Sequence, residues 1–267
     1  MDITLGQYYP VNSAIHRLDA RIKIIGVMLY IIGIFMVKGF VGYLFCSICF
    51  FAVAGLSKVP FRLIYKSLKP VVFIIMMTVV LNLLFNRTGT PLLQWWILKI
   101  TDDGVLLSVR MAIRLVLLVA GSSILTFTTS PIELTVGMEY LLAPFKKIGV
   151  PAHDIAMMTS IALRFIPTLM EELDKIKKAQ IARGADFDNG GFVKKAQSLI
   201  PLLVPLFVSS FRRADELALA MEARCYRGDV NRTKMNELKF VRADYISGGF
   251  ICIFLIVCIL LRFVWSF

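Results

Sequence analysis

The sequence lacks the motifs with which a protein could carry out chemistry of its own. It contains no Gly-x-x-x-x-Gly-Lys-Ser/Thr phosphate loop, which excludes ATP hydrolysis by that route, and no His-Glu-x-x-His zinc motif. Its two histidines, His16 and His153, are too few and too isolated to form a metal site. We therefore expect no catalytic residue, no metal site and no cofactor bound by this chain.

Cysteine is scarce, and its placement does not indicate a metal centre. Cys46 and Cys49 have a metal-like spacing, but no second pair or nearby histidine completes a site, so we interpret both as packing residues. No basic stretch is interleaved with aromatic residues, which argues against nucleic-acid binding. Residues 1–10 are mostly polar and lack the pattern of a cleavable signal peptide, so we expect none.

Apolar residues, in contrast, are abundant. They make up 58% of the chain, whereas soluble domains contain roughly 45–50%. Five apolar runs approach the roughly 17–25 residues that are needed to cross the hydrocarbon core of a bilayer. We predict an all-α, polytopic membrane protein with about five transmembrane helices, at residues 22–37, 40–56, 70–86, 105–128 and 246–265.

The distribution of lysine and arginine between these runs predicts their orientation in the cell membrane. Cytoplasmic segments of membrane proteins carry an excess of basic residues, and the formal net charge here is +12. Alternating the sides places 24 basic residues on one face and 3 on the other, with 17 of the 24 in residues 129–245. The N-terminus and residues 129–245 are therefore predicted to be cytoplasmic, and the C-terminus external.

Two arginines lie within the fourth apolar run. Arg110 and Arg114 are four residues apart, so they share one face of a helix. They lie either at the outer end of the helix, with their side chains extended to the interface, or in the interior of the bundle. Because Asp102 and Asp103 lie just upstream as counter-charges, we expect the outer end.

Residues 129–245 read as a structured cytoplasmic module. Their 17 basic residues are nearly balanced by 14 acidic ones. Helix starts are predicted at Ser130-Pro131 and at Val150-Pro151, because serine and proline favour the first positions of a helix. A third start is predicted near Phe192, after a polar turn at residues 186–191. The chain thus divides into residues 1–128 with four transmembrane helices, the 129–245 module of three coupling helices, and a C-terminal transmembrane helix in 246–267.

Two similar tripeptides end the long helices of this module. Ala182-Arg183-Gly184 and Ala223-Arg224-Cys225 each follow a charge-laced helical stretch. An arginine followed by glycine is ordinary C-terminal capping, but its repetition at two helix ends favours docking on a partner. Arginine presents a planar, permanently charged group that suits acidic or carbonyl partners. Between the tripeptides, residues 199–208 are apolar, interrupted by Pro201 and Pro205, and too short to cross a bilayer.

Three places in the sequence resemble the transmembrane T component of energy-coupling factor (ECF) transporters, which are ABC-type importers. The first is the N-terminal stretch from Gln7 to Lys23, which is similar to the family's His-x-Leu-Asp-Pro-Arg-x-Lys motif with Ala20 in place of proline. The other two are Ala182-Arg183-Gly184 and residues 221–228, where Cys225 replaces the family's glycine. With the pattern of apolar runs, the resemblance covers essentially the whole chain.

This resemblance implies a complex of four parts that imports a vitamin or a metal ion. Two ABC-type ATPase subunits, which use ATP and Mg, would bind the helix ends at Arg183 and Arg224, and a substrate-binding membrane (S) subunit would pack on another surface. From the residues themselves, the apolar flank of 199–208 with its prolines is expected to supply this surface, at Pro201, Leu202, Pro205 and Leu206. The chain would transmit ATP-driven motion between its partners in the lipid bilayer.

Two other interpretations remain open at this point. The chain is alternatively a membrane-anchored scaffold without a transport role. An intramembrane enzyme is more distant: Glu171 and Glu172 are adjacent, as in some intramembrane proteases, but Ile176 stands where those proteins have an arginine.

Overall fold

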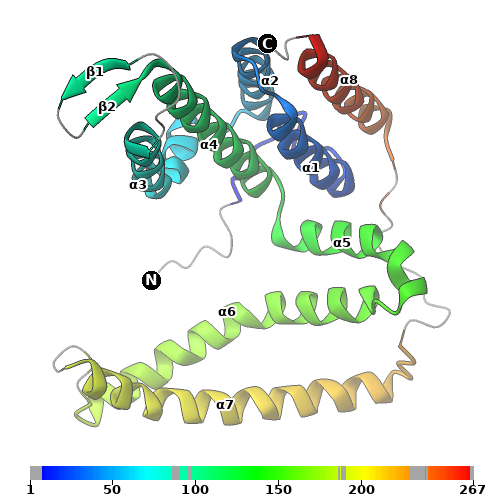
Figure 1. The fold of residues 1–267 in the computed structure, drawn as a ribbon. Coiled ribbons are helices and arrows are strands. Elements are labelled where there is room, and N and C mark those ends of the chain that lie inside the picture. The colour runs from blue at the N-terminus through cyan, green and yellow to red at the C-terminus, as the bar shows by residue number, and fades with distance from the viewer. Residues whose placement is uncertain are drawn as a thin grey trace. The chain divides into compact units, whose positions relative to one another are not determined.

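The computed structural model describes residues 8–85, 91–95, 98–185, 187, 191–228, 238 and 240–264. Over these residues the chain is predominantly helical, as predicted, and Figure 1 shows its elements in order. The elements are α1 (Ala20–Met36), α2 (Phe40–Ser57), α3 (Phe61–Phe85), β1 (Pro91–Trp95), β2 (Leu98–Thr101), α4 (Asp102–Thr128), α5 (Pro131–Leu142), the 3-10 helix η1 (Ala143–Ile148), α6 (Ala152–Ala182), α7 (Phe192–Ala223) and α8 (Arg242–Val264).

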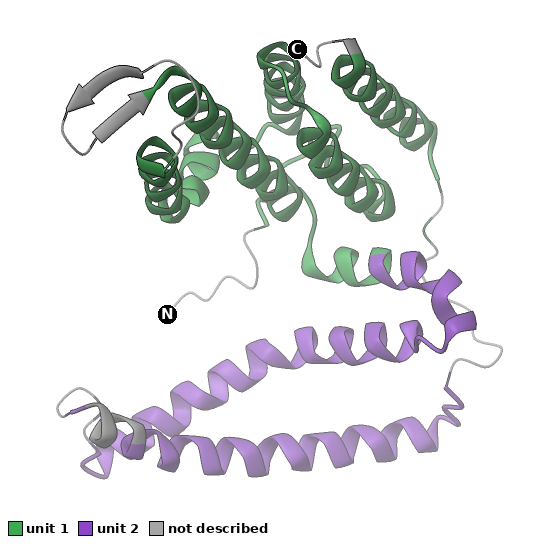
Figure 2. Ribbon diagram, viewed as in Figure 1, with its two compact units in different colours: residues 1–137, 237–267 green, residues 138–236 purple. Residues whose placement is uncertain are grey.

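The chain forms two compact units, which Figure 2 distinguishes by colour. Unit 1 comprises residues 1–137 and 237–267 and therefore holds α1 to α4, the first half of α5, and α8. Unit 2 comprises residues 138–236, with η1, α6 and α7. The division into residues 1–128, 129–245 and 246–267 concerns sidedness in a membrane, and it stays a prediction.

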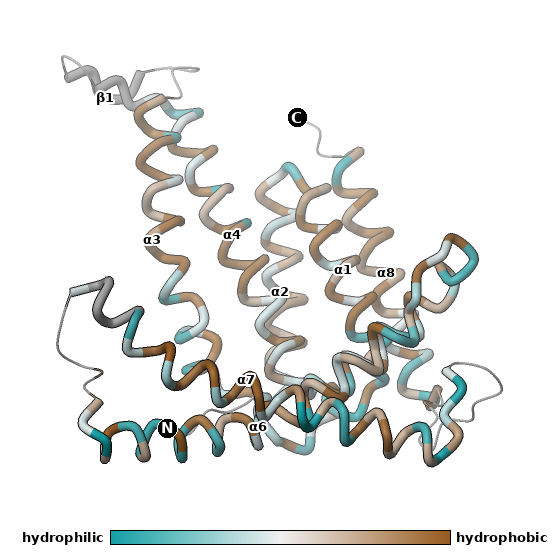
Figure 3. The backbone as a smooth tube through the Cα atoms, turned by 90° about the horizontal axis from the view of Figure 1, so that it is seen from below, coloured by the Kyte–Doolittle hydropathy of each residue, from teal (hydrophilic) through white to brown (hydrophobic). Residues whose placement is uncertain are grey.

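Four of the described helices are long and apolar enough to cross a membrane: α2, α3, α4 and α8. Helix α1 has 17 residues, at the lower limit of the usual length of a span. It packs against α4 and α8 in unit 1, and Figure 3 shows it among the other apolar helices of the bundle. The chain is a multi-pass membrane protein.

The ends of the predicted spans agree with those of the helices to within four residues, except at the start of the third. Helix α3 begins at Phe61, directly after Pro60, and Pro70 lies inside it. The prediction treated residues 57–69 as a loop because four basic residues interrupt the apolar pattern there. In the structure Arg62, Lys66 and Lys69 lie instead in the first turns of α3. Between α3 and α4, where a loop was expected, β1 and β2 pair as a short antiparallel hairpin.

The helix starts in the second half of the chain lie where the sequence predicts them. Helix α5 begins at Pro131 with a capping box, in which the Glu133 N–H donates to Ser130 Oγ at 3.2 Å and the Ser130 N–H donates to Glu133 Oε2 at 3.4 Å. Helix α6 begins directly after Pro151, and α7 begins at Phe192 and continues through both of its prolines.

The core of unit 1 is formed where α1, α2, α4 and α8 meet. Ile34 and Cys46 are fully buried there with Cys258 of α8, and Leu117 of α4 completes the contact. Gly121 of α4 faces the ring of Tyr30, so a larger residue at this position would collide with α1. Cys46 therefore belongs to the packed core, which is the role that the sequence analysis gave it.

Arg114 is the thirteenth of the 27 residues of α4, so it does not lie at the outer end of this helix, and its half-buried side chain faces the turn between α1 and α2. Its Nη2 donates to the Tyr43 hydroxyl at 2.6 Å, and its Nε donates to the same oxygen at 3.0 Å. Tyr43 is buried in α2, and the guanidinium also lies 5.6 Å from the centre of the Phe35 ring. A hydroxyl acceptor and two aromatic rings, those of Phe35 and Tyr43, thus receive this cation beside the turn between α1 and α2.

Candidate functional site

The first predicted tripeptide forms the C-terminal cap of α6. Arg183 is the C-cap residue, and Gly184 follows it with φ +88°. The Gly184 N–H donates to Ile181 O at 2.9 Å, and the Ala185 N–H donates to Gln180 O at 3.0 Å. These two bonds define a Schellman motif, in which a left-handed residue after the helix satisfies carbonyls of the last turn.

The second tripeptide repeats this geometry at the end of α7. Arg224 is the C-cap residue, and Cys225 follows it with φ +57°. The Cys225 N–H donates to Glu222 O at 2.8 Å, and the Tyr226 N–H donates to Met221 O at 3.0 Å. Cys225 thus takes the left-handed conformation that glycine has at the first site, and the helix ends there. This non-glycine residue pays a backbone strain of roughly 1–2 kcal/mol.

The caps are made by the main chain, and this bears on the role of the two arginines. The Arg183 N–H donates to Ala179 O and Gln180 O, and the Arg224 N–H donates to Met221 O, so any residue except proline could make the same bonds at these positions. Both side chains are exposed, as are the other four residues of the tripeptides. The guanidinium groups are therefore presented to solvent at two rigid helix ends, which an acidic or carbonyl partner can reach.

Helices α6 and α7 pack against each other and cross, as Figure 3 shows. At the contact Arg213 Nη2 of α7 lies 2.9 Å from Glu172 Oε2 of α6. A hydrogen bond from Ser209, reinforced by the positive charge of Arg213, lowers the pKa of Glu172 below its usual range. Ser209 and Arg213 are four residues apart on one face of α7, so both reach the same carboxylate. Glu172 thus contributes a direct polar contact between the two helices.

The ion pair lies at the same distance along each helix from the two caps. Glu172 lies eleven residues before Arg183, and Arg213 lies eleven residues before Arg224. Because α6 and α7 run in opposite directions (Figure 1), the two caps lie at opposite ends of the crossed pair. At 1.5 Å per residue, each is about 16 Å along its helix from the ion pair.

The predicted membrane-partner surface on α7 needs one correction. Leu202 is buried and Leu206 is half-buried, so Leu202 cannot contact a partner, whereas Pro201 and Pro205 are exposed. The apolar pattern locates this segment in the sequence. It does not show which side chains are exposed, because that depends on how α7 is rotated about its axis. The exposed apolar side chains of this part of α7 are Leu199, Ile200, Leu203, Val204, Phe207, Val208 and Phe211.

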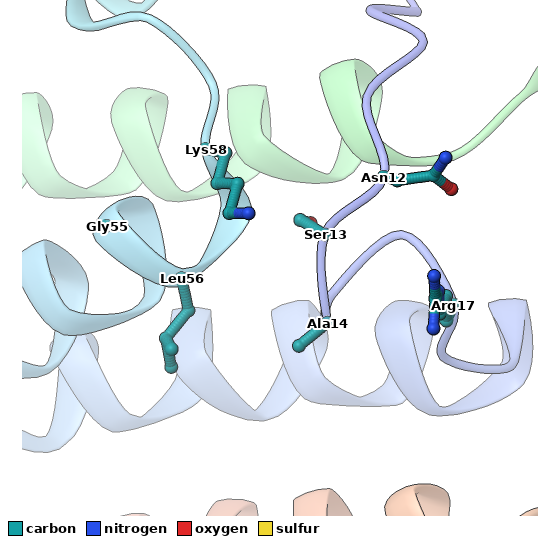
Figure 4. A pocket seen from close by; sticks show the side chains of 7 residues that line it. All are labelled: Asn12, Ser13, Ala14, Arg17, Gly55, Leu56 and Lys58. Atoms are coloured by element: carbon teal, nitrogen blue, oxygen red, sulfur yellow. The ribbon is translucent and has the colours of Figure 1, made fainter.

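A separate hollow of about 420 Å³ lies in unit 1 and is open to solvent. Figure 4 shows the side chains around it, which belong to Asn12, Ser13, Ala14, Arg17, Gly55, Leu56 and Lys58. Two of them are cationic and none is acidic, so the hollow does not suit a metal ion. Within the described parts of the chain, histidine, cysteine and acidic residues do not gather in threes as a metal site requires.

Comparison with known proteins assigns the chain to a family. The family model "CbiQ: Cobalt transport protein" matches residues 11–235. A protein of Clostridium kluyveri named "Energy-coupling factor transporter transmembrane protein EcfT" is 53% identical over 259 residues, which cover 97% of this chain and 95% of that protein. Proteins of the same name from Acidaminococcus fermentans (54% over 247 residues, 92% of each chain) and Bacillus subtilis (44% over 240 residues, 90% of this chain and 91% of that protein) are also similar. The chain therefore belongs to the family of transmembrane components of energy-coupling factor transporters.

Proposed function

We propose that this chain couples two ABC-type ATPase subunits to a substrate-binding membrane subunit, and so drives the uptake of a vitamin or a metal ion. The observation that carries the proposal is the pair of exposed arginines, Arg183 and Arg224, on two equivalent Schellman caps. Two similar subunits require two similar docking points, and the crossed pair of α6 and α7 supplies them. The partners bind and hydrolyse ATP with Mg, while this chain holds no cofactor.

The crossed helices suit the transmission of motion because each is one continuous element. Helix α6 has 31 residues and α7 has 32, so each is more than 45 Å long at 1.5 Å per residue. The Glu172–Arg213 ion pair joins them near the crossing. A force on either cap would therefore move a whole helix about this contact. It would not be absorbed by a flexible loop.

The S subunit is proposed to contact the exposed apolar face of α7. The seven exposed apolar residues between Leu199 and Phe211 would be unfavourable in water. The segment is too short to cross a bilayer, so a partner with an apolar surface at the membrane is the occupant that this composition favours. Pro201 and Pro205 lie on the exposed side of the same segment.

The proposed orientation places the N-terminus and unit 2 in the cytoplasm and the C-terminus outside. Five crossings, by α1, α2, α3, α4 and α8, are consistent with the distribution of basic residues. Helix α3 begins at Phe61, earlier than the predicted start at residue 70. The charge count is unchanged, because Arg62, Lys66 and Lys69 still lie at the same end of this helix. The ATPase partners would then bind unit 2 on the side where ATP is present.

The experiment compares the wild type with the Arg183→Ala, Arg224→Ala double variant. The tagged chain is purified from membranes in mild detergent, and co-purifying proteins are identified while cells are assayed for uptake of labelled vitamins and of Co²⁺. We expect the wild type to retain two ATPase subunits and an S subunit, and the double variant to lose the ATPases and uptake. Arg164→Ala, at an exposed arginine elsewhere on α6, is the matched control. A wild-type chain that co-purifies without ATPases would favour the scaffold interpretation.

A further inference from the structure

The basic and acidic residues at the start of α1 are not explained by the docking of partners. Asp19, Arg21 and Lys23 lie within five residues of one another, and here they are called the N-terminal clamp. Asp19 and Lys23 are buried, at 8% and 7% exposure. Burying such groups costs free energy unless each is hydrogen-bonded, so their contacts are informative.

Lys23 holds the C-terminal end of α4. Its Nζ donates to Thr128 O at 3.1 Å and to His16 O at 3.0 Å. The Tyr9 N–H donates to the neighbouring Phe127 O at 3.0 Å. The last carbonyls of a helix have no partner within the helix, and a cation stabilises the negative end of the helix dipole. The N-terminal segment thus caps α4 with one charge and one main-chain N–H.

Asp19 is bonded to the N-terminal end of α8. The Asp19 N–H donates to Asp244 Oδ1 at 2.9 Å, and the Val241 N–H donates to Asp244 Oδ2 at 2.8 Å. Asp244 is 2% exposed and lies in the first turn of α8, while the Asp19 side chain accepts from the Arg21 N–H at 2.9 Å and caps α1. One carboxylate therefore joins the first turns of two helices.

Arg21 reaches the chain just before α8. Its Nη2 donates to Leu238 O at 2.9 Å. Its guanidinium lies 5.0 Å from the centre of the Phe240 ring, within the range of a cation–π interaction. Leu238 and Phe240 are thus both held by the same side chain.

These contacts lie near the two places where the chain passes between the units. After Thr128 the chain enters α5, and unit 2 begins within that helix at Met138. The chain returns from unit 2 at residue 237, just before the segment that Arg21 and Asp244 hold. Lys23 therefore holds the end of α4 from which the chain leaves towards unit 2, and Arg21 and Asp19 hold the segment to which it returns.

We propose that the N-terminal clamp fixes both connections to the membrane bundle, so that motion of unit 2 is transmitted to the bundle instead of being absorbed by loose connections. This inference rests on the proposed coupling function. Arg21 and Lys23 act as positioning residues: they act through α4 and α8 rather than on substrate or ATP. Their loss uncouples ATP hydrolysis from uptake while the ATPases remain bound, because the docking arginines lie in unit 2.

The experiment uses the assembled complex with Lys23→Met, which keeps the aliphatic chain and removes the charge, and with Arg21→Ala. Arg17→Ala, an exposed arginine of the same segment, is the matched control. Three quantities are measured: co-purified ATPase, ATP hydrolysis by the purified complex, and uptake of whichever vitamin or ion the wild type imports. We expect the first two to stay within about twofold of wild type and uptake to fall about tenfold or more, as expected for lost coupling between sites.

The outcomes separate this inference from the proposed function. A wild-type chain that retains no ATPase contradicts the proposed function itself. If the wild type retains ATPase and imports substrate, unchanged uptake in both clamp variants overturns the clamp alone. Parallel loss of ATPase and uptake overturns it too, as does failure of both variants to accumulate, because the residues would then serve docking or folding rather than transmission.

Discussion

Glu172 of α6 and Arg213 of α7 form an ion pair at 2.9 Å, and each lies eleven residues before the arginine that caps its own helix. The two candidate docking points are therefore equidistant from the contact that joins their helices. The length of helix between the ion pair and the cap is therefore the same for a partner bound at either helix end. This equality of the two arms suits a pair of related ATPase subunits.

The ion pair predicts a specific dependence on pH. Ser209 and Arg213 lower the pKa of Glu172 below its usual value of 4.5. The folded-state pKa is depressed, so the contribution of the ionised carboxylate is fully present above about pH 4.5 and is lost as the pH falls through the lower folded value. Thermal unfolding in detergent should show wild type more stable than Glu172→Gln at pH 7, with a difference that shrinks below pH 4.5. A difference that is constant from pH 7 to pH 3 would contradict the assigned ion pair.

The left-handed residue of the first cap predicts an effect at Gly184. No atom of the described chain lies within 4 Å of a Cβ placed there, so the cost of Gly184→Ala is the backbone strain at φ +88° alone, about 1–2 kcal/mol. Gly249→Ala makes the same chemical change within helix α8, where no described atom lies within 4 Å of the added Cβ. This control substitution should not be destabilising, because alanine favours a helix more than glycine does. Thermal unfolding of both variants in detergent measures the two effects. Equal melting temperatures would rule out strain at the α6 cap.

The two hydrogen bonds from Arg114 to the Tyr43 hydroxyl predict that Tyr43 is needed for stability. Tyr43→Phe removes the hydroxyl that accepts both guanidinium bonds, and the loss of a hydrogen bond to a charged group costs about 1.5–3 kcal/mol. Tyr65→Phe is the matched control, because Tyr65 is 72% exposed on α3. The measurement is the melting temperature of the purified chain. Equal effects of the two tyrosine substitutions would contradict the assigned hydrogen bonds between Arg114 and Tyr43.

Cys225 reports the orientation of unit 2. It is exposed at the end of α7, so with the other four cysteines replaced by alanine it is the natural target of a membrane-impermeant thiol reagent. We expect no labelling in intact cells and full labelling after permeabilisation, because the excess of basic residues places unit 2 inside. Labelling of intact cells would reverse the proposed orientation.

Much of this architecture could be predicted because its causes are local in sequence. The capping box at Ser130 and Glu133, the helix start after Pro151 and the glycine at 184 each determine a helix end from a few neighbouring residues. The apolar runs likewise locate the bundle helices, apart from the first turns of α3, where basic side chains interrupt the pattern without interrupting the helix.

The contacts that could not be predicted join residues far apart in the chain. Arg114 meets Tyr43 across 71 residues, and Asp19 meets Asp244 across 225. A four-residue spacing shows that Arg110 and Arg114 share a face but not what that face meets. The same reason explains Leu202: its helix and segment are evident in the sequence, but its burial depends on the rotation of α7.

The central claim, that Arg183 and Arg224 dock the ATPases, is tested most directly by titrating the purified ATPase pair onto the chain in lipid nanodiscs. The loss of a buried, hydrogen-bonded charge at an interface costs about 2–5 kcal/mol, or roughly 30-fold or more in affinity. Each single alanine variant should therefore bind at least about 30-fold more weakly, and the double variant should not bind measurably, because two anchors on one rigid pair reinforce each other. Arg→Lys at either position should restore binding only in part, since a point charge cannot replace the planar guanidinium. Wild-type affinity in the double alanine variant would contradict the account and leave both arginines as helix caps.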